Sequence, residues 1–269
     1  MPKKDSYFPF DEKEISWLCH RDSQLKAVIS HMEKPKRKLL PDLFSGLIFY
    51  IIHNRFRQKL PKQNGHVSNK SIEEQYAQYL KELPYIGGKK SIHNGEGGTY
   101  DCIFLFALYE ALNHKPTMQD IYDLNCSVFL PSFEKLKKWK FIDANHALIL
   151  RIIYFVFRVA AWMGRKDRKT ETGFIMCMEP FVKTEGIHYR FDRCPIAEFA
   201  KAHHLLHLMP ALCNGDYPAM EDLHATLIRK NTCANGDVCD YWIVGDKSEI
   251  AKTHPRKTDD AGYWYNKNL

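Results

Sequence analysis

The spacing of apolar residues along the chain changes once, near residue 170. Before that point apolar residues recur three and four positions apart, which is typical of amphipathic helices, and after it they alternate with polar residues, as in strands. The first pattern predicts helices over 71–83, 99–113, 117–125, 132–140 and 146–163. The second predicts strands over 173–180, 187–194, 224–232 and 238–244, with a helix over 195–209 between the second and the third. We therefore expect an α+β fold, a helical N-terminal half followed by an antiparallel sheet of about four strands with an inserted helix.

Local signals support several of these boundaries. Ser71 and Thr117 are placed to cap the helices that follow them, and Pro195 suits the first turn of the inserted helix. Asn214-Gly215 indicates a turn, and Asn235-Gly236 predicts a hairpin between the last two strands. The tail after residue 245 is polar and carries no clear pattern.

Residues 146–163 form the most apolar stretch of the chain and are long enough to be compared with a membrane span. Arg151 and Arg158 lie inside it, and a central arginine costs about 2.5–3.5 kcal/mol on membrane insertion. We therefore predict a buried helix of a soluble protein that packs on the sheet. The opening residues have no apolar core behind their lysines, so no signal peptide is expected and the predicted location is the cytoplasm.

A polar segment at residues 61–69 predicts a boundary between a helical leader, residues 1–60, and an α+β domain, residues 61–269. The segment YFPFDEKEISWLCHRDSQLKAVISHM…LLPDLFSGLIFYIIHN, within residues 6–54, resembles the opening helices of an alkyladenine-type DNA glycosylase. The later LPYIGGKKS lacks the glycine spacing of that family's hairpin, and no matching helix with a catalytic aspartate follows. We interpret the segment as a leader without glycosylase activity, and keep a DNA-interacting protein as a second alternative.

The composition permits a full core, with 45% hydrophobic and 13% aromatic residues among 269. The formal net charge of +7 allows nucleic acid, a membrane surface or an anionic small molecule as partner without selecting one. We expect a small-molecule substrate and neither a membrane nor a nucleic acid as partner, and leave the oligomeric state open.

Residues that could do chemistry gather between 186 and 244. Cys194 precedes Pro195 at a helix N-terminus, where free amides and the helix dipole can stabilise a thiolate, although it can equally be a plain capping residue. Cys213 ends the helical stretch, and Asp216 can be a base, an orienting carboxylate or a turn residue.

Cys239 and Asp240 are neighbours on a predicted strand, so only one of them can face a site unless the strand bulges. Either Cys239 faces the site while Asp240 binds the backbone of a nearby loop, or the reverse. Arg229 and Thr232 combine a cation with a hydroxyl and could cradle a carboxylate, or could end an ordinary exposed strand.

A metal site is not expected from this pattern. The cysteines show no C-x-x-C pair and the histidines no H-E-x-x-H motif. His203 and His207 are four residues apart and so share a helix face, which the polar side of an amphipathic helix also explains.

The ordered segments PYIGGKKS…RCPIAEF…LCNGDY…LIRKNTCANGDVCDYWI resemble the L-2-amino-thiazoline-4-carboxylic acid hydrolase family over about residues 70–245. The family pattern of a cysteine-proline before a helix is met by Cys194-Pro195, and its cysteine followed by an aspartate by Cys213 and Asp216. Its closing segment is met by a set that comprises Arg229, Thr232, Gly236, Cys239, Asp240 and Tyr241. The chain departs from the pattern at Asn231, Cys233 and Tyr241, the last standing where phenylalanine is common.

The resemblance implies an enzyme that hydrolyses a cyclic isothiourea carrying a carboxylate and opens the ring to N-carbamoyl-L-cysteine. The reaction needs a nucleophile or base, an acid and a cation. The resemblance implies that a cysteine (Cys194, Cys213 or Cys239), an aspartate (Asp216 or Asp240) and Arg229 supply these roles. Thr232 and Tyr241 would complete the substrate site. No metal or cofactor is required by this chemistry. The same pattern looks distantly like vinyl reductase-like ligand-binding domains, so a small-ligand binding or sensory domain is the first alternative.

Overall fold

The computed structural model describes residues 69–83, 85–88, 91, 99–113, 115–138 and 142–269. The predicted leader, residues 1–60, with its glycosylase-like segment, lies outside these residues. So does the proposed boundary, except for Asn69, where the first described helix begins. The division into two domains therefore stays a prediction.

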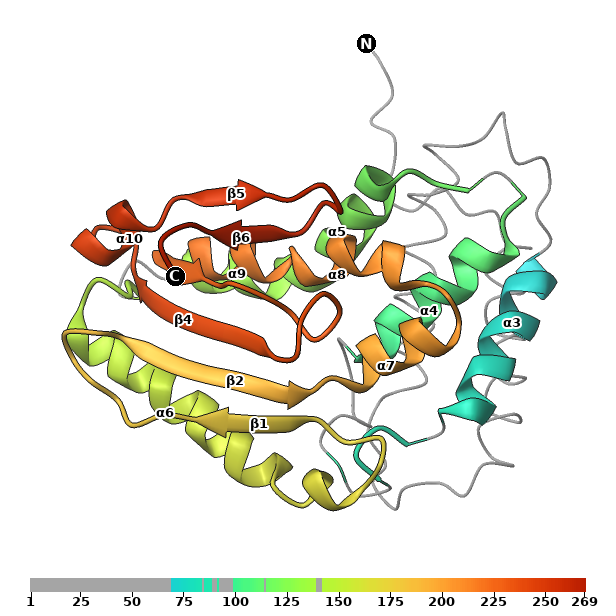
Figure 1. Ribbon diagram of the computed structural model, residues 1–269, viewed down its shortest axis with the longest axis horizontal. Helices are drawn as coiled ribbons and strands as arrows, with labels where there is room; N and C mark the ends of the chain where they lie inside the picture. The colour runs from blue at the N-terminus through green and yellow to red at the C-terminus, as the bar shows by residue number, and fades with distance from the viewer. Residues whose placement is uncertain (1–68, 84, 89–90, 92–98, 114, 139–141) are drawn as a thin grey trace, which may run out of the picture.

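The helical half is confirmed, with differences at its boundaries. It consists of α3 (Asn69–Glu82), α4 (Thr99–Ala111), α5 (Met118–Lys137) and α6 (Ala147–Gly164) (Figure 1). Ser71 lies inside the first turn of α3 and not before it. Thr117 caps α5 as predicted, in a capping box with Asp120. The two helices predicted over 117–125 and 132–140 are wrong, because α5 is one continuous helix whose contacts with α8 and α9 override the weak local break.

The predicted sheet is also present, which confirms the α+β class. Its strands are β1 (Ile175–Met178), β2 (Ile187–Arg193), β3 (Ala225–Ile228) and β4 (Cys239–Gly245), in the order β1-β2-β4-β3. All three pairings are antiparallel, with Tyr189 opposite Tyr241 in the centre. The strand predicted over 224–232 ends four residues early, so the connection to β4 is a loop that contains the predicted Asn235-Gly236 turn.

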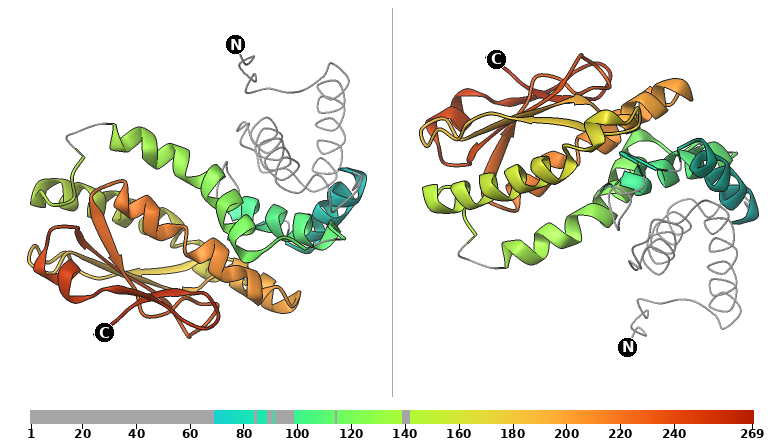
Figure 2. Two further views of the ribbon diagram at one scale, coloured as in Figure 1. Left: turned by 90° about the horizontal axis from the view of Figure 1, so that it is seen from above. Right: turned by 90° about the horizontal axis from the view of Figure 1, so that it is seen from below.

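The two faces of the sheet differ as the alternation predicts. Ile187, Tyr189 and Ile243 point into the core, whereas His188 and Trp242 stack on the opposite face with ring centroids 4.9 Å apart. Helices α6 and α9 contact β1 and β3 respectively. Figure 2 shows α8 and α9 against the sheet with α5 beyond them, so that this face is backed by helices in two layers.

The connection between β2 and β3 holds several short helices and not the single predicted one. It contains α7 (Pro195–Ala202), the 3₁₀ turn η3 (Leu206–Leu208), α8 (Met209–Cys213) and α9 (Asp216–Glu221). His204 adopts φ 59°, which ends the α-helical path after α7. Pro210 lies in the first turn of α8, where its missing N–H is not needed. The prediction placed a turn at Asn214-Gly215 and no element between it and residue 224, and so it missed α9.

The polar tail is ordered and joins the core. It forms α10 (Glu249–Thr253) and a two-stranded hairpin of β5 (Arg256–Thr258) and β6 (Trp264–Asn266). The buried Asn266 Oδ1 accepts hydrogen bonds from the Arg229 amide at 3.0 Å and the Tyr217 hydroxyl at 3.2 Å. The tail thereby fixes the backbone at the end of β3.

Helix α6 packs on the sheet as predicted, with Phe157 against Tyr189 at a centroid distance of 5.2 Å. The prediction that it is buried is wrong, because Leu150 is its only buried residue. Within the described chain, residues 147–169 are the one helical stretch long and apolar enough to cross a membrane by length and composition, and only 6% of its window is buried. The apolar spacing identified the helix, but it could not distinguish burial in the protein from exposure.

Candidate active site

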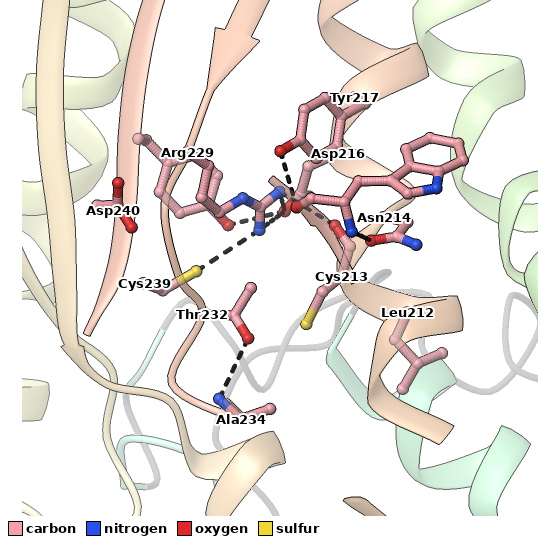
Figure 3. A network of polar contacts seen from close by, with 12 residues as sticks. Leu212, Cys213, Asn214, Asp216, Tyr217, Arg229, Thr232, Ala234, Cys239 and Asp240 are labelled. Carbon is pink, nitrogen blue, oxygen red and sulfur yellow. Dashed lines mark hydrogen bonds and ion pairs between the residues drawn. The ribbon is translucent and has the colours of Figure 1, made fainter. Parts of the chain in front are cut away.

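Three segments that are separate in the sequence meet beneath the inner face of the sheet: the α8–α9 junction, the end of β3 and the start of β4 (Figure 3). The junction is held by two asparagines. Asn125 Nδ2 donates to the carbonyls of Ala211 and Leu212, and Asn214 Nδ2 donates to the carbonyl of Gly262 at 2.9 Å. These bonds tie the short helices to α5 and to the tail, and so fix the position at which Asp216 begins α9.

Asp216 and Arg229 form an ion pair at the centre of this cluster. Arg229 donates from both Nη1 and Nη2 to Asp216 Oδ2, each at 3.2 Å, and the Tyr241 hydroxyl donates to the same oxygen at 2.8 Å. All three bonds reach Oδ2 and none reaches Oδ1. The Arg229 side chain is 1% exposed and that of Asp216 is 30% exposed. The carboxylate is therefore the member of the pair that solvent and small molecules can reach.

Both Nη atoms of the Arg229 guanidinium contact other groups of the protein, whereas the buried Nε has no hydrogen-bond partner among the described residues. Its Nη2 donates to the Cys213 carbonyl at 3.2 Å, and its Nη1 lies 3.7 Å from Cys239 Sγ. The rings of Tyr217 and Tyr241 lie 5.1 and 4.8 Å from its carbon atom, within the range of cation–π attraction.

Burial alone would lower the pKa of Arg229, but its anionic and phenolic neighbours outweigh burial and hold the pKa above its ordinary value. Arg229 is a permanent cation that holds Asp216. Both Nη atoms are paired and the side chain is 1% exposed, so the contact with a substrate carboxylate that we expected stays untested.

The three candidate thiols lie close enough that their charges would affect one another. Burial raises the pKa of Cys213, whose neighbours include Cys239 and Cys194, and the nearby Arg229 only partly opposes this. Burial likewise raises the pKa of Cys239, again against the influence of Arg229. At neutral pH both side chains are thiols.

For Cys194, the pKa favours the plain capping residue over the thiolate, the two alternatives that the sequence left open. Cys194 does precede α7 with Pro195 in the first turn, and the amides of Ala197 and Ile196 do lower its pKa. Burial has the larger effect and raises the pKa above its ordinary value. The helix terminus is present, but an unpaired thiolate there would be poorly solvated.

The structure also decides between the two alternatives for Cys239 and Asp240. Cys239 and Tyr241 face the cluster, whereas the Asp240 carboxylate accepts from the backbone amides of Lys230 and Asn231, both at 2.8 Å. We therefore remove Asp240 from the candidate catalytic residues, because its two oxygens stabilise the loop.

Thr232 is buried and serves the same loop. Its hydroxyl donates to Asn235 Oδ1 at 2.9 Å and accepts from the Ala234 amide at 3.2 Å. Figure 3 shows this second bond. The structure therefore gives the Thr232 hydroxyl a role in the turn, and its predicted contact with substrate stays untested.

Several contributors to the site were not predicted. Tyr189 stacks on Tyr241 with centroids 4.5 Å apart and planes 9° from parallel, which fixes the ring that donates to Asp216. Tyr217 and Asn266 support Arg229 from the other side. Strand alternation could have placed Tyr189 beside Tyr241, but nothing in the sequence indicates the register or the partner of the tail.

A small cavity of about 180 Å³ lies between α6 and the sheet. Its lining is aromatic and apolar apart from Arg168 and comprises Phe157, Ala160, Ala161, Gly164, Arg168, Phe174, Met176, Tyr189 and Phe191. It borders the Tyr189–Tyr241 stack, but neither Asp216 nor any candidate cysteine lines it. We assign it no step of the chemistry.

Within the described residues no three histidine, cysteine or acidic side chains are grouped so that they could hold a metal ion. His203 and His207, which are four residues apart in the sequence, contact other side chains. His203 Nε2 lies 2.8 Å from Glu82, and His207 Nε2 lies 3.2 Å from the Tyr109 hydroxyl. They do not share a helix face as we expected, because α7 ends at Ala202 and His207 lies in η3.

The fold and the cluster place the chain in the class of α+β proteins with a small polar site between a sheet and short helices. Residues 102–243 match the family model described as L-2-amino-thiazoline-4-carboxylic acid hydrolase. This is more than half of the 269 residues, and the chain belongs to that family. The family resemblance is thus confirmed, whereas the glycosylase-like segment lies outside the matched span. Searches of curated proteins and of solved structures found no match to the chain.

Proposed function

We propose that this protein is a hydrolase that opens L-2-amino-thiazoline-4-carboxylate, or a close cyclic isothiourea, to N-carbamoyl-L-cysteine. Membership of the family supports the substrate class. The observation that carries the proposal is the geometry of Asp216, whose Oδ2 is held by Arg229 and Tyr241 while Oδ1 takes part in none of those bonds. A carboxylate that is oriented and still partly exposed has the position of a general base.

In the proposed reaction Asp216 Oδ1 removes a proton from water as the water oxygen bonds to the ring carbon between sulfur and nitrogen. The hydroxyl proton then moves to the ring nitrogen. The carbonyl forms as the carbon–sulfur bond breaks, and the sulfur leaves with the electron pair. Asp216 returns its proton to that sulfur, so that one water is consumed and the enzyme is regenerated.

The proposal gives the cysteines no covalent step. Nucleophilic attack needs a thiolate, and burial keeps Cys194, Cys213 and Cys239 protonated at neutral pH. Of these three cysteines, Cys239 contacts the guanidinium of Arg229, at 3.7 Å, and so it is the cysteine to test if the chemistry proves to be covalent.

The test is the conversion of L-2-amino-thiazoline-4-carboxylate by the purified full-length protein. The protein is removed by filtration before a thiol reagent is added, so that its own cysteines do not contribute, and the product is identified by its mass. We expect enzyme-dependent release of N-carbamoyl-L-cysteine that a chelator does not change. An absence of product at enzyme concentrations close to that of substrate would refute the proposed substrate.

A further inference from the structure

Most of the exposed large apolar side chains in the described chain lie on one side of α6. Nine large hydrophobic side chains are exposed among the described residues, and seven of them belong to this helix: Leu148, Ile152, Phe155, Val156, Val159, Trp162 and Met163. Leu148 is 70% exposed and Phe155 is 65% exposed. Contiguous apolar surface of this kind marks a site of contact with a partner or a membrane.

The other side of α6 is occupied by the protein. Leu150 is buried, and Tyr154 and Phe157 pack on Phe181 and Tyr189 with ring centroids 5.4 and 5.2 Å apart. A helix that crossed a bilayer would have to leave the sheet and break these contacts. The helix can instead meet a membrane while lying parallel to it, with its exposed side toward the lipid.

Cations border the apolar side, and no exposed acid accompanies them along the helix. Arg151, Arg158 and Arg165 recur every seven residues and so lie along one edge of α6. Lys166, Arg168 and Lys169 extend the charge beyond the helix end, and the one acid in 147–169, Asp167, is buried. This pattern complements an anionic surface, whereas a second copy of the same helix would offer these arginines no opposite charge.

A groove beside the helix supplies a second feature. A cavity of about 650 Å³ lies between α6 and the loop after β1, and its lining includes Arg151, Arg158 and Lys183. Leu148 and Phe181 line the same groove, so cations and apolar side chains meet there. At the far end of the helix the Arg165 guanidinium lies 4.9 Å from the Trp162 ring, an aromatic–cation pair suited to the boundary between headgroups and acyl chains.

We propose that α6 is a membrane-contact surface that binds anionic phospholipid, with its apolar side in the outer part of the bilayer and phosphate headgroups in the groove of Arg151, Arg158 and Lys183. This departs from our initial expectation of no membrane partner. It rests on residues that the proposed hydrolysis does not use. Lipid binding and hydrolysis can therefore fail independently of each other.

The test is co-sedimentation of the full-length protein with vesicles of phosphatidylcholine alone or with added phosphatidylserine. We expect binding only to the anionic vesicles, with a loss in high salt. Phe155→Gln with Trp162→Gln should abolish it, and Arg151→Gln with Arg158→Gln should weaken it about fivefold per cation. Leu269→Gln is the matched control, since Leu269 is an exposed apolar residue away from α6, and it should bind as the unchanged protein does.

Three results would overturn the proposal. One is equal sedimentation with neutral and anionic vesicles, or none with either. Another is a concentration-dependent dimer that the Phe155→Gln, Trp162→Gln protein no longer forms, which would assign the surface to a second copy. The third is cross-linking of a photoreactive group at position 155 to residues before 69, which would show that the chain covers the surface itself.

Discussion

The pairing of Asp216 with Arg229 predicts that removing Asp216 lowers the free energy of unfolding more than removing Arg229 does. In Asp216→Asn the amide oxygen can still accept hydrogen bonds. The Arg229 guanidinium, however, loses the carboxylate that balances its charge, and the Arg229 side chain is only 1% exposed. Removing one partner of a buried ion pair costs about 3–5 kcal/mol. Because the Asp216 side chain is 30% exposed, we expect the lower end of that range, about 3 kcal/mol.

Arg229→Met removes the cation and leaves a side chain of similar length between two tyrosine rings. Asp216 keeps the Tyr241 hydroxyl and gains water, while the Cys213 carbonyl loses its donor. We expect a loss of about 1–2 kcal/mol, since one unsatisfied acceptor costs that much. The double variant contains no unpaired charge, so it should resemble Arg229→Met, with a coupling energy of about 3 kcal/mol in magnitude.

The assay is urea unfolding of the four proteins at pH 7, followed by far-ultraviolet circular dichroism. The matched control is Asp240→Asn combined with Arg229→Met, because Asp240 bonds only to backbone amides in the described contacts. That pair should show little coupling beyond its single effects. Additive effects of the Asp216 and Arg229 changes, or a greater cost for Arg229→Met than for Asp216→Asn, would refute the reasoning.

Three further predictions concern the Tyr241 hydroxyl, the buried thiols and Gly186. Tyr241→Phe removes the hydroxyl bond to Asp216 and should lower the unfolding free energy by about 1.5–3 kcal/mol and also slow turnover; unchanged stability in urea would count against the bond. Burial raises the pKa of Cys213 and Cys239, so above the ordinary thiol pKa the folded state keeps protons that the unfolded state loses. The free energy of unfolding should therefore fall as the pH rises from 9 to 11. A variant with serine at both positions should show a shallower fall. Gly186→Ala places a Cβ 2.3 Å from the Ile243 carbonyl oxygen at φ 87° and should cost about 2–4 kcal/mol in urea unfolding; a change below about 1 kcal/mol would contradict the close approach.

The period of the apolar pattern was sufficient to predict the class and the sheet. Ile187, Tyr189 and Ile243 face the core because strand geometry alternates side chains, whatever the rest of the chain does. Boundaries were predicted less well where tertiary contacts decide them. Helix α5 continues through a weak break because it packs along α8 and α9.

The candidate site was predicted in part. The sequence located Asp216, Arg229 and Cys239, but their relation depends on contacts between elements that no local spacing reports. Helix α9 was missed because it has six residues and directly follows Asn214-Gly215, which the prediction interpreted as a turn. A cysteine before a helix suggested a thiolate, yet the pKa depends on burial, which only the packing shows.

The direct test of the account is the turnover number of Asp216→Asn measured beside Cys239→Ser and Asp240→Asn, each shown to be folded at the assay temperature. If Asp216 is the general base, Asp216→Asn should lower kcat about 100- to 10,000-fold. The other two variants should then retain kcat of the same order as the unchanged protein. A Cys239→Ser protein that folds but does not turn over, with Asp216→Asn still active, would contradict the account and assign the chemistry to the thiol.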